Sequence, residues 1–359
     1  MEIGEWGIEM EDGKMKTVVC EATGETRLKE VEVPRIGPEE MLIKVWGCGL
    51  CATDVMKVFS PSVPKPVQLG HEVVGEIVEV GAKVEGWAVG ERVATAHHVP
   101  CFTCQYCRHG NYSMCPEFKK SNFEPGGFSE YVRLPAPHVK HNTVRLPEEV
   151  SYDQAVFTEP LACCLRAMKR VPTLIGDVVL IVGLGTVGLL CLQVLKRSGV
   201  FILASDLQEK RLALASELGA DLTLNPRHDD VYAHVMKASE ERGCDLVLLT
   251  VISPAIFEQV LRYVRDGGTI LIFGCKIEDA PFSAGPWEFF RRELTITTSY
   301  SPSPLELKEA VLLMEQGGVR LETLITHRLP LAAFDQALKL QKEMAALKII
   351  IGDEAAKGK

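Results

Sequence analysis

Four cysteines in one short loop constrain the fold of this chain more than any other feature. In the run CFTCQYCRHGNYSMC, two residues separate each of the first three cysteines, and seven separate the third from the fourth. Four thiolates this close together can form a complete tetrahedral shell around one Zn²⁺, which leaves no position open for a substrate. We therefore predict a structural zinc site in the loop at 97–116, with the ligands Cys101, Cys104, Cys107 and Cys115.

A pair of disulfide bonds in the same loop is the alternative. The sequence starts with an acidic segment that lacks the basic region and apolar stretch of an export signal. We therefore expect the twelve cysteines to lie in a reducing compartment, most simply the cytoplasm, where disulfide bonds are rare.

Charge and hydropathy limit the partners of the chain. Charges or prolines interrupt every apolar run well before about 18 residues, so we expect no membrane-spanning helix. The net charge of −9 disfavours nucleic acid and anionic membranes as partners. A small molecule is the expected partner.

The pattern of short apolar segments predicts an α/β protein with two domains, as expected for 359 residues. From residue 15 to about 99, apolar runs between glycines and prolines are typical of strands in a compact, mostly β domain. After residue 178, strands and helices alternate, which favours a doubly wound parallel sheet with helices on both faces. Ser151 followed by Gln154 predicts a capping box that begins a short helix, and Pro160 predicts the start of a second helix.

A glycine-rich turn marks a candidate dinucleotide site. The glycines of VVLIVGLGTVGLL follow an apolar strand and open an apolar helix in the G-x-G-x-x-G arrangement. The first allows a tight turn, the second lets the backbone approach a pyrophosphate, and the third allows close packing of helix and sheet. The N–H groups at the start of the helix attract the phosphates. The candidate cofactor-binding residues of this turn are Gly183, Gly185, Thr186, Val187 and Gly188.

An acidic residue at the end of the next strand, Asp206, indicates which dinucleotide binds. Its carboxylate can accept hydrogen bonds from both ribose hydroxyls and would repel a 2′-phosphate, so we expect NAD and not NADP. Arg211 completes the predicted set of cofactor-binding residues. A glycine turn without a ligand is the alternative interpretation.

Further metal-ligand candidates are scattered along the chain. Cys51 lies in GCGLCATD, His71 and Glu72 lie in LGHEVVGEIVEVG, and Glu159 lies in TEPLACC. One thiol, one imidazole and two carboxylates can form a zinc site that exchanges a ligand for water or substrate. Taken singly, each residue also has a structural explanation, as a buried thiol, a core histidine or a helix cap.

Together these motifs resemble those of the zinc-dependent medium-chain dehydrogenases of the alcohol dehydrogenase superfamily, in the branch of sorbitol and related polyol dehydrogenases. The resemblance extends from about Met15 to Ile351 and includes GCGLCATD, GHE-x2-G-x5-G, the four-cysteine loop, EPL and the glycine turn. It implies a GroES-like catalytic domain at 1–160 and 299–359 and an NAD-binding Rossmann domain at 161–298. It also implies two Zn²⁺ per subunit, NAD as cofactor, and a homo-oligomer, either a dimer or a tetramer.

The resemblance also implies roles for individual residues. Cys51, His71 and Glu72 would bind a catalytic zinc, with Glu159 as a direct or water-mediated fourth ligand. Thr53 matches the hydroxyl that touches the substrate oxygen. The implied reaction is hydride transfer between NAD and a secondary alcohol or ketone.

The substrate that we favour is a polyol, either a sugar alcohol or a cyclitol, because the glutamate of EPL is typical of that branch. The alternatives are an L-threonine 3-dehydrogenase-like enzyme, a simple secondary alcohol dehydrogenase and a zinc-independent reductase of the same fold. A non-enzymatic protein that binds zinc and nucleotide is the alternative from a different class.

The sequence departs from the family pattern at three positions. Ala52 replaces a usual glycine, Met56 replaces a histidine that passes protons to solvent in many relatives, and Phe102 replaces a common glycine. We expect Asp54 to orient a metal ligand, and His97 and His98 to have structural or surface roles. The remaining cysteines are expected in the core: Cys20, Cys48, Cys163, Cys164, Cys191, Cys244 and Cys275.

Overall fold

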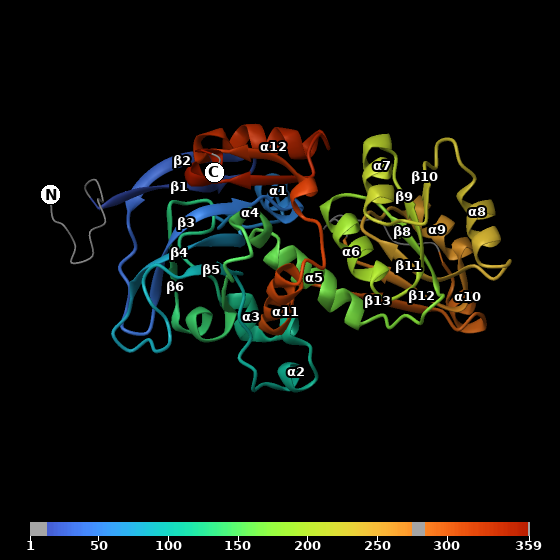
Figure 1. The fold of residues 1–359 in the computed structure, drawn as a ribbon, viewed down its shortest axis with the longest axis horizontal. Helices are drawn as coiled ribbons and strands as arrows, with labels where there is room; N and C mark the ends of the chain where they lie inside the picture. The colour runs from blue at the N-terminus through green and yellow to red at the C-terminus, as the bar shows by residue number, and fades with distance from the viewer. Residues whose placement is uncertain (1–12, 275–283, 358–359) are drawn as a thin grey trace. The chain divides into compact units, whose positions relative to one another are not determined.

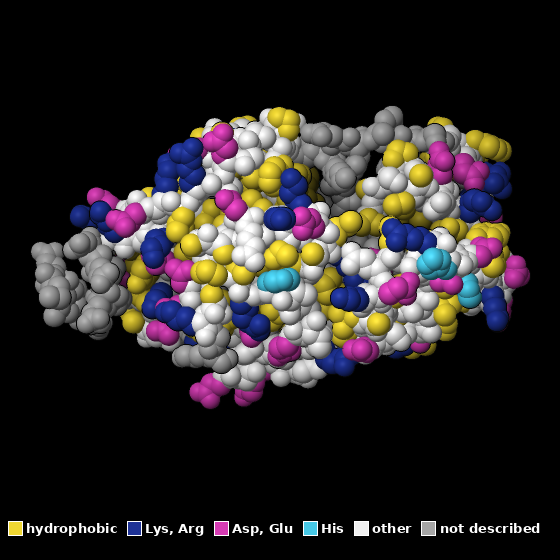
Figure 2. All heavy atoms as spheres, turned by 90° about the horizontal axis from the view of Figure 1, so that it is seen from above, with side chains coloured by type: hydrophobic (Ala, Val, Ile, Leu, Met, Phe, Trp, Pro, Cys, Tyr) yellow, Lys and Arg dark blue, Asp and Glu magenta, His cyan; other side chains and the backbone are white. Residues whose placement is uncertain are grey.

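The computed structural model describes residues 13–274 and 284–357, which are drawn in colour in Figure 1. The chain forms two compact units, one from Met1–Glu159 with Ser303–Lys359 and the other from Pro160–Pro302. None of the described helices is long and apolar enough to cross a membrane. On the face shown in Figure 2, Lys and Arg side chains are interspersed with Asp and Glu side chains.

The first unit is built around a mostly antiparallel sheet that joins the two ends of the chain. Its strands lie in the order β14-β15-β3-β4-β5-β7, and β6 pairs with β3. The C-terminal strand β15 is antiparallel to β3 and parallel to β14, so the C-terminal residues belong to this sheet. The strands are β3 (Met41–Gly49), β4 (Glu72–Val80), β5 (Arg92–Thr95), β6 (Tyr131–Leu134), β7 (Thr143–Arg145), β14 (Ile325–Leu329) and β15 (Lys348–Ile351), beside the hairpin of β1 (Lys14–Ala22) and β2 (Glu25–Glu32).

Short helices connect these strands. The capping box predicted from Ser151 and Gln154 is confirmed: the Ser151 hydroxyl accepts from the Gln154 N–H, and the Gln154 side chain accepts from the Ser151 N–H. The helices of this unit are α1 (Ala52–Phe59), α2 (Gln105–Arg108), α3 (Pro116–Lys120), α4 (Tyr152–Ala155), α11 (Pro304–Glu315), α12 (Phe334–Lys342) and α13 (Asp353–Lys357), with the single turns η1 (Tyr112–Met114), η2 (His138–Asn142), η3 (Glu322–Leu324) and η4 (Leu331–Ala333).

The second unit contains the predicted parallel sheet. The strands lie in the order β10-β9-β8-β11-β12-β13. The chain thus builds the sheet outward from β8 on one side and then from β11 on the other, as in dinucleotide-binding Rossmann folds. The central strand β8 is an apolar run, VVLIV, as expected for a strand with both faces covered. The strands are β8 (Val178–Val182), β9 (Phe201–Ser205), β10 (Leu222–Leu224), β11 (Cys244–Leu249), β12 (Val264–Ile272) and β13 (Thr295–Thr298), with the helices α6 (Thr186–Lys196), α7 (Glu209–Glu217), α8 (Val231–Ala238), α9 (Pro254–Tyr263) and α10 (Pro286–Arg291).

The structure differs from the sequence analysis in the start of one helix and in the burial of one cysteine. The helix predicted to start at Pro160 is α5 (Thr158–Lys169), so the proline lies within its first turn, where a missing N–H is tolerated. Cys163 is only half-buried, and Cys275 lies outside the described residues. The other five cysteines expected in the core are fully buried: Cys20, Cys48, Cys164, Cys191 and Cys244.

Candidate functional site

The four cysteines of the 97–116 loop meet at one point. Their sulfur atoms all lie within 4.8 Å of one another. Cys104 Sγ and Cys107 Sγ are 3.6 Å apart, which is too far for a disulfide bond. Zn–S bonds of about 2.3 Å in a tetrahedron place sulfur atoms about 3.8 Å apart. The arrangement therefore fits a zinc ion.

Hydrogen bonds in the loop also favour thiolates. Cys101 Sγ accepts from the Cys104 N–H at 3.3 Å, and Cys115 Sγ accepts from the Cys101 N–H at 3.4 Å. A hydrogen bond from the Thr103 side chain, together with backbone donors, lowers the pKa of Cys101 to about 6. Burial raises the pKa of Cys107 to about 12. In the absence of metal this thiol therefore keeps its proton, which zinc must displace.

Phe102, at the position where the resemblance led us to expect a glycine, has a backbone conformation that favours glycine. Its φ is 58°, in the left-handed region that a side chain disfavours. The Phe102 ring packs against Tyr112 and His141, with centroids 5.5 Å and 4.9 Å away. Because His141 belongs to η2, this contact attaches the cysteine loop to the body of the unit.

A second cluster of candidate ligands forms where β3 ends and β4 begins. The ligand atoms of Cys51, His71 and Glu72 lie within 4.8 Å of one another. Antiparallel pairing sets Gly49 opposite Glu72, so Cys51, two residues further on, comes close to His71. A Cβ atom at Gly49 would lie 1.8 Å from Glu72 Oε2, so only glycine allows this carboxylate to stay in place.

Asp54 is fully buried beneath this cluster and makes the contacts expected of a residue that orients a ligand. Its carboxylate accepts from the Cys51 N–H at 3.2 Å and from the Gly70 N–H at 3.0 Å. Asp54 Oδ1 lies 3.4 Å from His71 Nδ1. Burial alone would lower the pKa of His71, but the Asp54 carboxylate outweighs it and raises that pKa well above its usual value. A more basic imidazole is a better metal ligand.

Lys348 on β15 belongs to this site and was missed by the sequence analysis. It is buried, and its ammonium group donates a hydrogen bond to Glu72 Oε2. Burial alone would lower the pKa of Lys348, but the charges of Glu72 and Cys51 outweigh it and raise that pKa. The available signal was a single charge in the apolar run ALKIII, because buried lysines are rare unless they are paired.

Glu159 and Thr53 are the two remaining residues that the sequence analysis assigned to this site. Glu159 is buried in the first turn of α5, and its charge contributes to the raised pKa of Lys348. It is not one of the three residues whose ligand atoms lie within 4.8 Å of one another. Thr53 is an exposed residue in the first turn of α1, two positions after Cys51.

His97, for which we expected a structural or surface role, lies beside a candidate metal ligand. Its ring centroid is 4.7 Å from that of His71 and 3.7 Å from that of His98. Burial lowers the pKa of His97 well below its usual value and that of His98 to about 4. His98 also packs on Phe118 of the cysteine loop.

The three glycines of the turn in the second unit differ in backbone conformation and in surroundings. Gly183 has a φ of 94°, which favours glycine. A Cβ atom at Gly188 would lie 2.0 Å from the Gly183 carbonyl oxygen, whereas one at Gly185 would have no neighbour within 4 Å. Gly185 is the N-cap of α6, and Thr186 and Val187 are partly exposed in its first turn. The start of the helix is thus open to an anionic group.

Asp206 lies at the carboxyl end of β9, next to this turn. Its carboxylate accepts from the Leu184 N–H at 2.7 Å and from the Gln208 N–H at 2.9 Å. Arg211 Nη1 lies 3.8 Å from Asp206 Oδ2. The backbone therefore fixes the orientation of this carboxylate.

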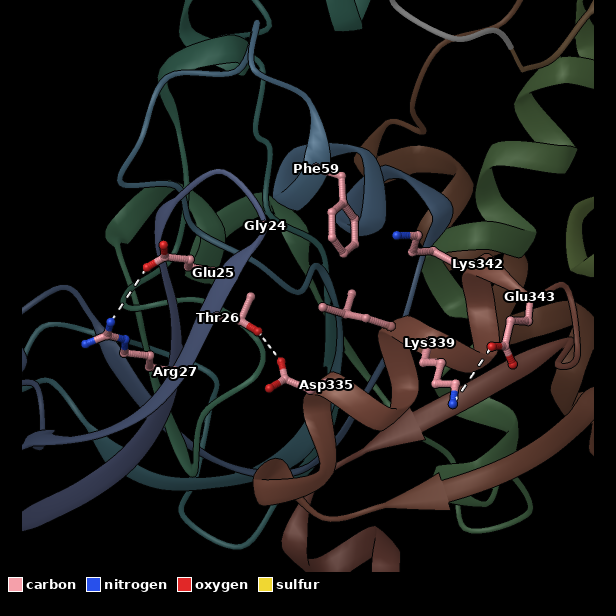
Figure 3. A pocket seen from close by; sticks show the side chains of 10 residues that line it. Gly24, Glu25, Thr26, Arg27, Phe59, Asp335, Lys339, Lys342 and Glu343 are labelled. Atoms are coloured by element: carbon pink, nitrogen blue, oxygen red, sulfur yellow. Dashed lines mark hydrogen bonds and ion pairs between the residues drawn. The ribbon is translucent and has the colours of Figure 1, made fainter.

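A cavity of about 600 Å³ lies in the first unit between the β1–β2 turn, α1 and α12 (Figure 3). None of the predicted site residues lines it, and Lys342 Nζ covers the Phe59 ring at its edge. Its other charged groups contact partners within the cavity wall, which leaves little to recognise a ligand. These pairs are Glu25 with Arg27, Thr26 with Asp335, and Lys339 with Glu343.

Comparison with known proteins links both units to one family. A family model described as alcohol dehydrogenase GroES-like domain matches residues 37–148, and one described as zinc-binding dehydrogenase matches residues 186–316. A sorbitol dehydrogenase of Bombyx mori is 30% identical over 93% of this chain and 97% of its own length. An L-threonine 3-dehydrogenase of Pyrococcus abyssi is 32% identical over 90% of this chain and 94% of its own length.

Solved structures agree with these similarities. The crystal structure of galactitol-1-phosphate dehydrogenase from Escherichia coli matches with a TM-score of 0.82 and 30% identity. The match covers 94% of this chain and 99% of that one.

Proposed function

The chain belongs to the family of zinc-dependent alcohol dehydrogenases with a GroES-like domain, and from this membership we propose that it oxidises a polyol at a secondary hydroxyl group with NAD as hydride acceptor. The family establishes a zinc-binding dehydrogenase that uses a nicotinamide dinucleotide. The polyol and the choice of NAD are the proposal.

The observation that carries the polyol proposal is the carboxylate content of the second metal cluster. Glu72 lies with Cys51 and His71, and the buried Glu159 lies close enough to act on Lys348. Hydroxyl groups of a polyol can donate hydrogen bonds to carboxylate oxygens, and a polyol offers more such donors than a simple alcohol does. The similarity to a sorbitol dehydrogenase and to a galactitol-1-phosphate dehydrogenase supports the same class of substrate.

The residues of the site suit this chemistry. Zinc held by Cys51, His71 and Glu72 supplies a Lewis acid that lowers the pKa of an alcohol hydroxyl. Thr53 accepts the hydroxyl proton and passes it toward solvent, to which its side chain is exposed. The glycine turn and Asp206 would hold NAD, which would supply the hydride acceptor, and the protein would contribute its position and a polar environment.

The NAD preference and the second zinc have separate support. The carboxylate of Asp206, which two backbone N–H groups orient, would lie against a 2′-phosphate. The four-thiolate cluster supports the proposal of a second zinc per chain, and four cysteines that stay reduced support a location in the cytoplasm. We also propose a homo-oligomer.

Threonine is the second candidate substrate, because the Pyrococcus abyssi relative is as similar as the sorbitol dehydrogenase. Steady-state rates with NAD on sorbitol, xylitol, inositols, threonine, 2,3-butanediol and 2-propanol separate the candidates. We expect the highest kcat/KM on a polyol. A clear preference for threonine or 2-propanol contradicts the polyol proposal.

A further inference from the structure

A basic side chain on α1 shares a helix face with Thr53, the residue to which the proposed function assigns contact with the substrate oxygen. Lys57 follows Thr53 by four residues, and residues at this spacing are neighbours on the surface of a helix. Long side chains of a helix lean toward its N-terminus. We therefore expect the Lys57 side chain to lean back toward the turn that carries Thr53.

The contacts of Lys57 agree with this direction. Its Nζ lies 3.5 Å from the Gln68 carbonyl oxygen. Gln68 comes two residues before Gly70, whose N–H donates to Asp54 Oδ1 in the first turn of α1. The segment that leads to the candidate ligand His71 thus runs beside this turn, and the Lys57 ammonium group lies along it.

Residues that follow the cysteine loop lie on another side of the same group. Asn122 Nδ2 donates to Gln68 Oε1, and the carbonyl oxygen of the adjacent Ser121 lies 2.7 Å from His98 Nδ1. Burial is the main cause that lowers the pKa of His98 to about 4, and the charge of Lys57 acts in the same direction. Three parts of the first unit therefore meet around this ammonium group: α1, the approach to β4 and the end of the cysteine loop.

Lys57 is accessible to a ligand, in contrast to Lys348. Lys348 is buried and paired with Glu72, whereas Lys57 is partly exposed and forms no ion pair with any carboxylate among the described residues. An ammonium group has three donors, and its contact with Gln68 is long and uses one of them. A cation with free donors thus lies beside the candidate substrate position.

We propose that Lys57 is a specificity-determining residue that binds an anionic group of the polyol, either a phosphate monoester or a carboxylate, while the reacting hydroxyl lies at Thr53. The inference rests on the proposed function, since it narrows the polyol to one that carries a charged group. One helical turn, about 5.4 Å, separates the two positions on α1, so a polyol chain of several carbons can reach from one to the other. Charge-assisted hydrogen bonds are roughly twice as strong as neutral ones, so the ammonium group favours an anion over a further hydroxyl.

The test uses three substrates with the same carbon chain: sorbitol, sorbitol 6-phosphate and gluconate. Each anionic form differs from sorbitol in one terminal group. We expect the wild type to prefer one anionic form over sorbitol in kcat/KM, and the preferred form identifies the anion as phosphate or carboxylate. Lys57→Met should reduce this preference by about 10- to 100-fold, mainly through KM, and Lys57→Arg should keep most of it.

A binding measurement and a control accompany the rates. Because a dinucleotide also carries phosphates, the Kd for NADH is measured by fluorescence titration, and Lys57→Met should leave it unchanged. The matched control is Lys83→Met, which removes the same charge from an exposed lysine beside Glu39. It should keep the substrate preference of the wild type.

The outcomes separate this inference from the proposed function. A wild type that oxidises sorbitol and prefers neither anionic form contradicts the role of Lys57 alone. An equal loss on all three substrates in Lys57→Met indicates a structural role, and weaker NADH binding assigns Lys57 to the cofactor, so either result overturns the inference. A wild type inactive on all three that oxidises threonine or 2-propanol contradicts both.

Discussion

Thr53 and Met56 lie three residues apart on α1, and only Thr53 carries a group that exchanges protons. Residues at this spacing share a helix face, so Met56 occupies the neighbouring position without continuing a relay. In the proposed mechanism, the path of the proton therefore depends on the hydroxyl of Thr53.

We predict that Thr53→Val, which keeps the shape and removes the hydroxyl, lowers kcat by roughly 10². The measurement is the steady-state rate on the best alcohol of the panel, with Thr26→Val in the β1–β2 hairpin as a control for the substitution itself. Unchanged turnover in Thr53→Val would mean that water or another group takes the proton.

The Lys348–Glu72 pair gives a prediction about stability. Lys348→Met leaves a buried carboxylate without its cation, which costs about 3–5 kcal/mol. We expect this loss in the free energy of unfolding by urea denaturation of metal-free protein, and a partial recovery in the double variant Glu72→Gln, Lys348→Met. The matched control is Lys357→Met, because the exposed Lys357–Glu354 pair on α13 is worth less than about 1 kcal/mol. Similar losses in the two lysine variants would contradict the importance of the buried pair.

Asp206 determines the expected choice of dinucleotide. Charge repulsion against a 2′-phosphate and the lost ribose contact should together favour NAD over NADP by more than about 2 kcal/mol, or about thirtyfold in kcat/KM. Asp206→Asn keeps the size and should narrow this ratio. Asp221→Asn is the control, because Asp221 also accepts from a backbone N–H, that of Ile202, but is not a predicted cofactor residue. Equal use of both dinucleotides by the wild type would refute the argument.

Among the structural elements, we expect the cysteine loop to depend most on a bound metal. Its own apolar cluster contains only Cys107, Cys115 and Phe118 as buried residues, which is too little to hold α2 and α3 in place. In contrast, β3 and β4, which carry the second cluster, belong to a large core with many buried apolar side chains. The two metal sites should therefore respond differently to loss of zinc.

We predict two zinc ions per chain by elemental analysis, and one in each of two variants. Cys104→Ser should lower the melting temperature, because structural zinc contributes directly to folding. Cys51→Ser should keep the melting temperature within a few degrees and abolish turnover. A fully active wild type with one zinc or none would disprove the two-site assignment.

At the scale of the whole molecule, an edge strand indicates where copies can associate. Among the described residues β13 ends the parallel sheet, and its residue Ile296 is partly exposed. Trp287 and Phe290 on α10 are 68% and 76% exposed, so apolar side chains gather close to this edge in the sequence. Unpaired strand edges and exposed apolar groups favour pairing with another chain.

We predict a homo-oligomer by size-exclusion chromatography with light scattering, and a lower mass for Ile296→Lys, because a charge on an edge strand opposes pairing. Ile175→Lys is the control, since Ile175 is 88% exposed in a loop outside the sheet. A monomeric wild type would contradict the prediction, and a mass loss in both variants would remove the argument for β13.

The features that could be predicted from the sequence are those whose residues are close along the chain. The cysteine spacing was enough to predict a four-thiolate cluster, because a loop this short brings the sulfurs together whatever surrounds it. The glycine turn between an apolar strand and helix, and the capping box of Ser151 and Gln154, are local for the same reason.

Which distant residues share a site became clear only from the folded chain. Lys348 meets Glu72 across 276 positions of sequence, because β15 joins β3 in the sheet and β3 pairs with β4. His97 lies beside His71 through the register of β4 and β5, although its sequence context indicated a structural or surface role. Strand order and register set these distances, and both depend on the packing of the whole sheet, which the spacing of residues along the chain does not encode.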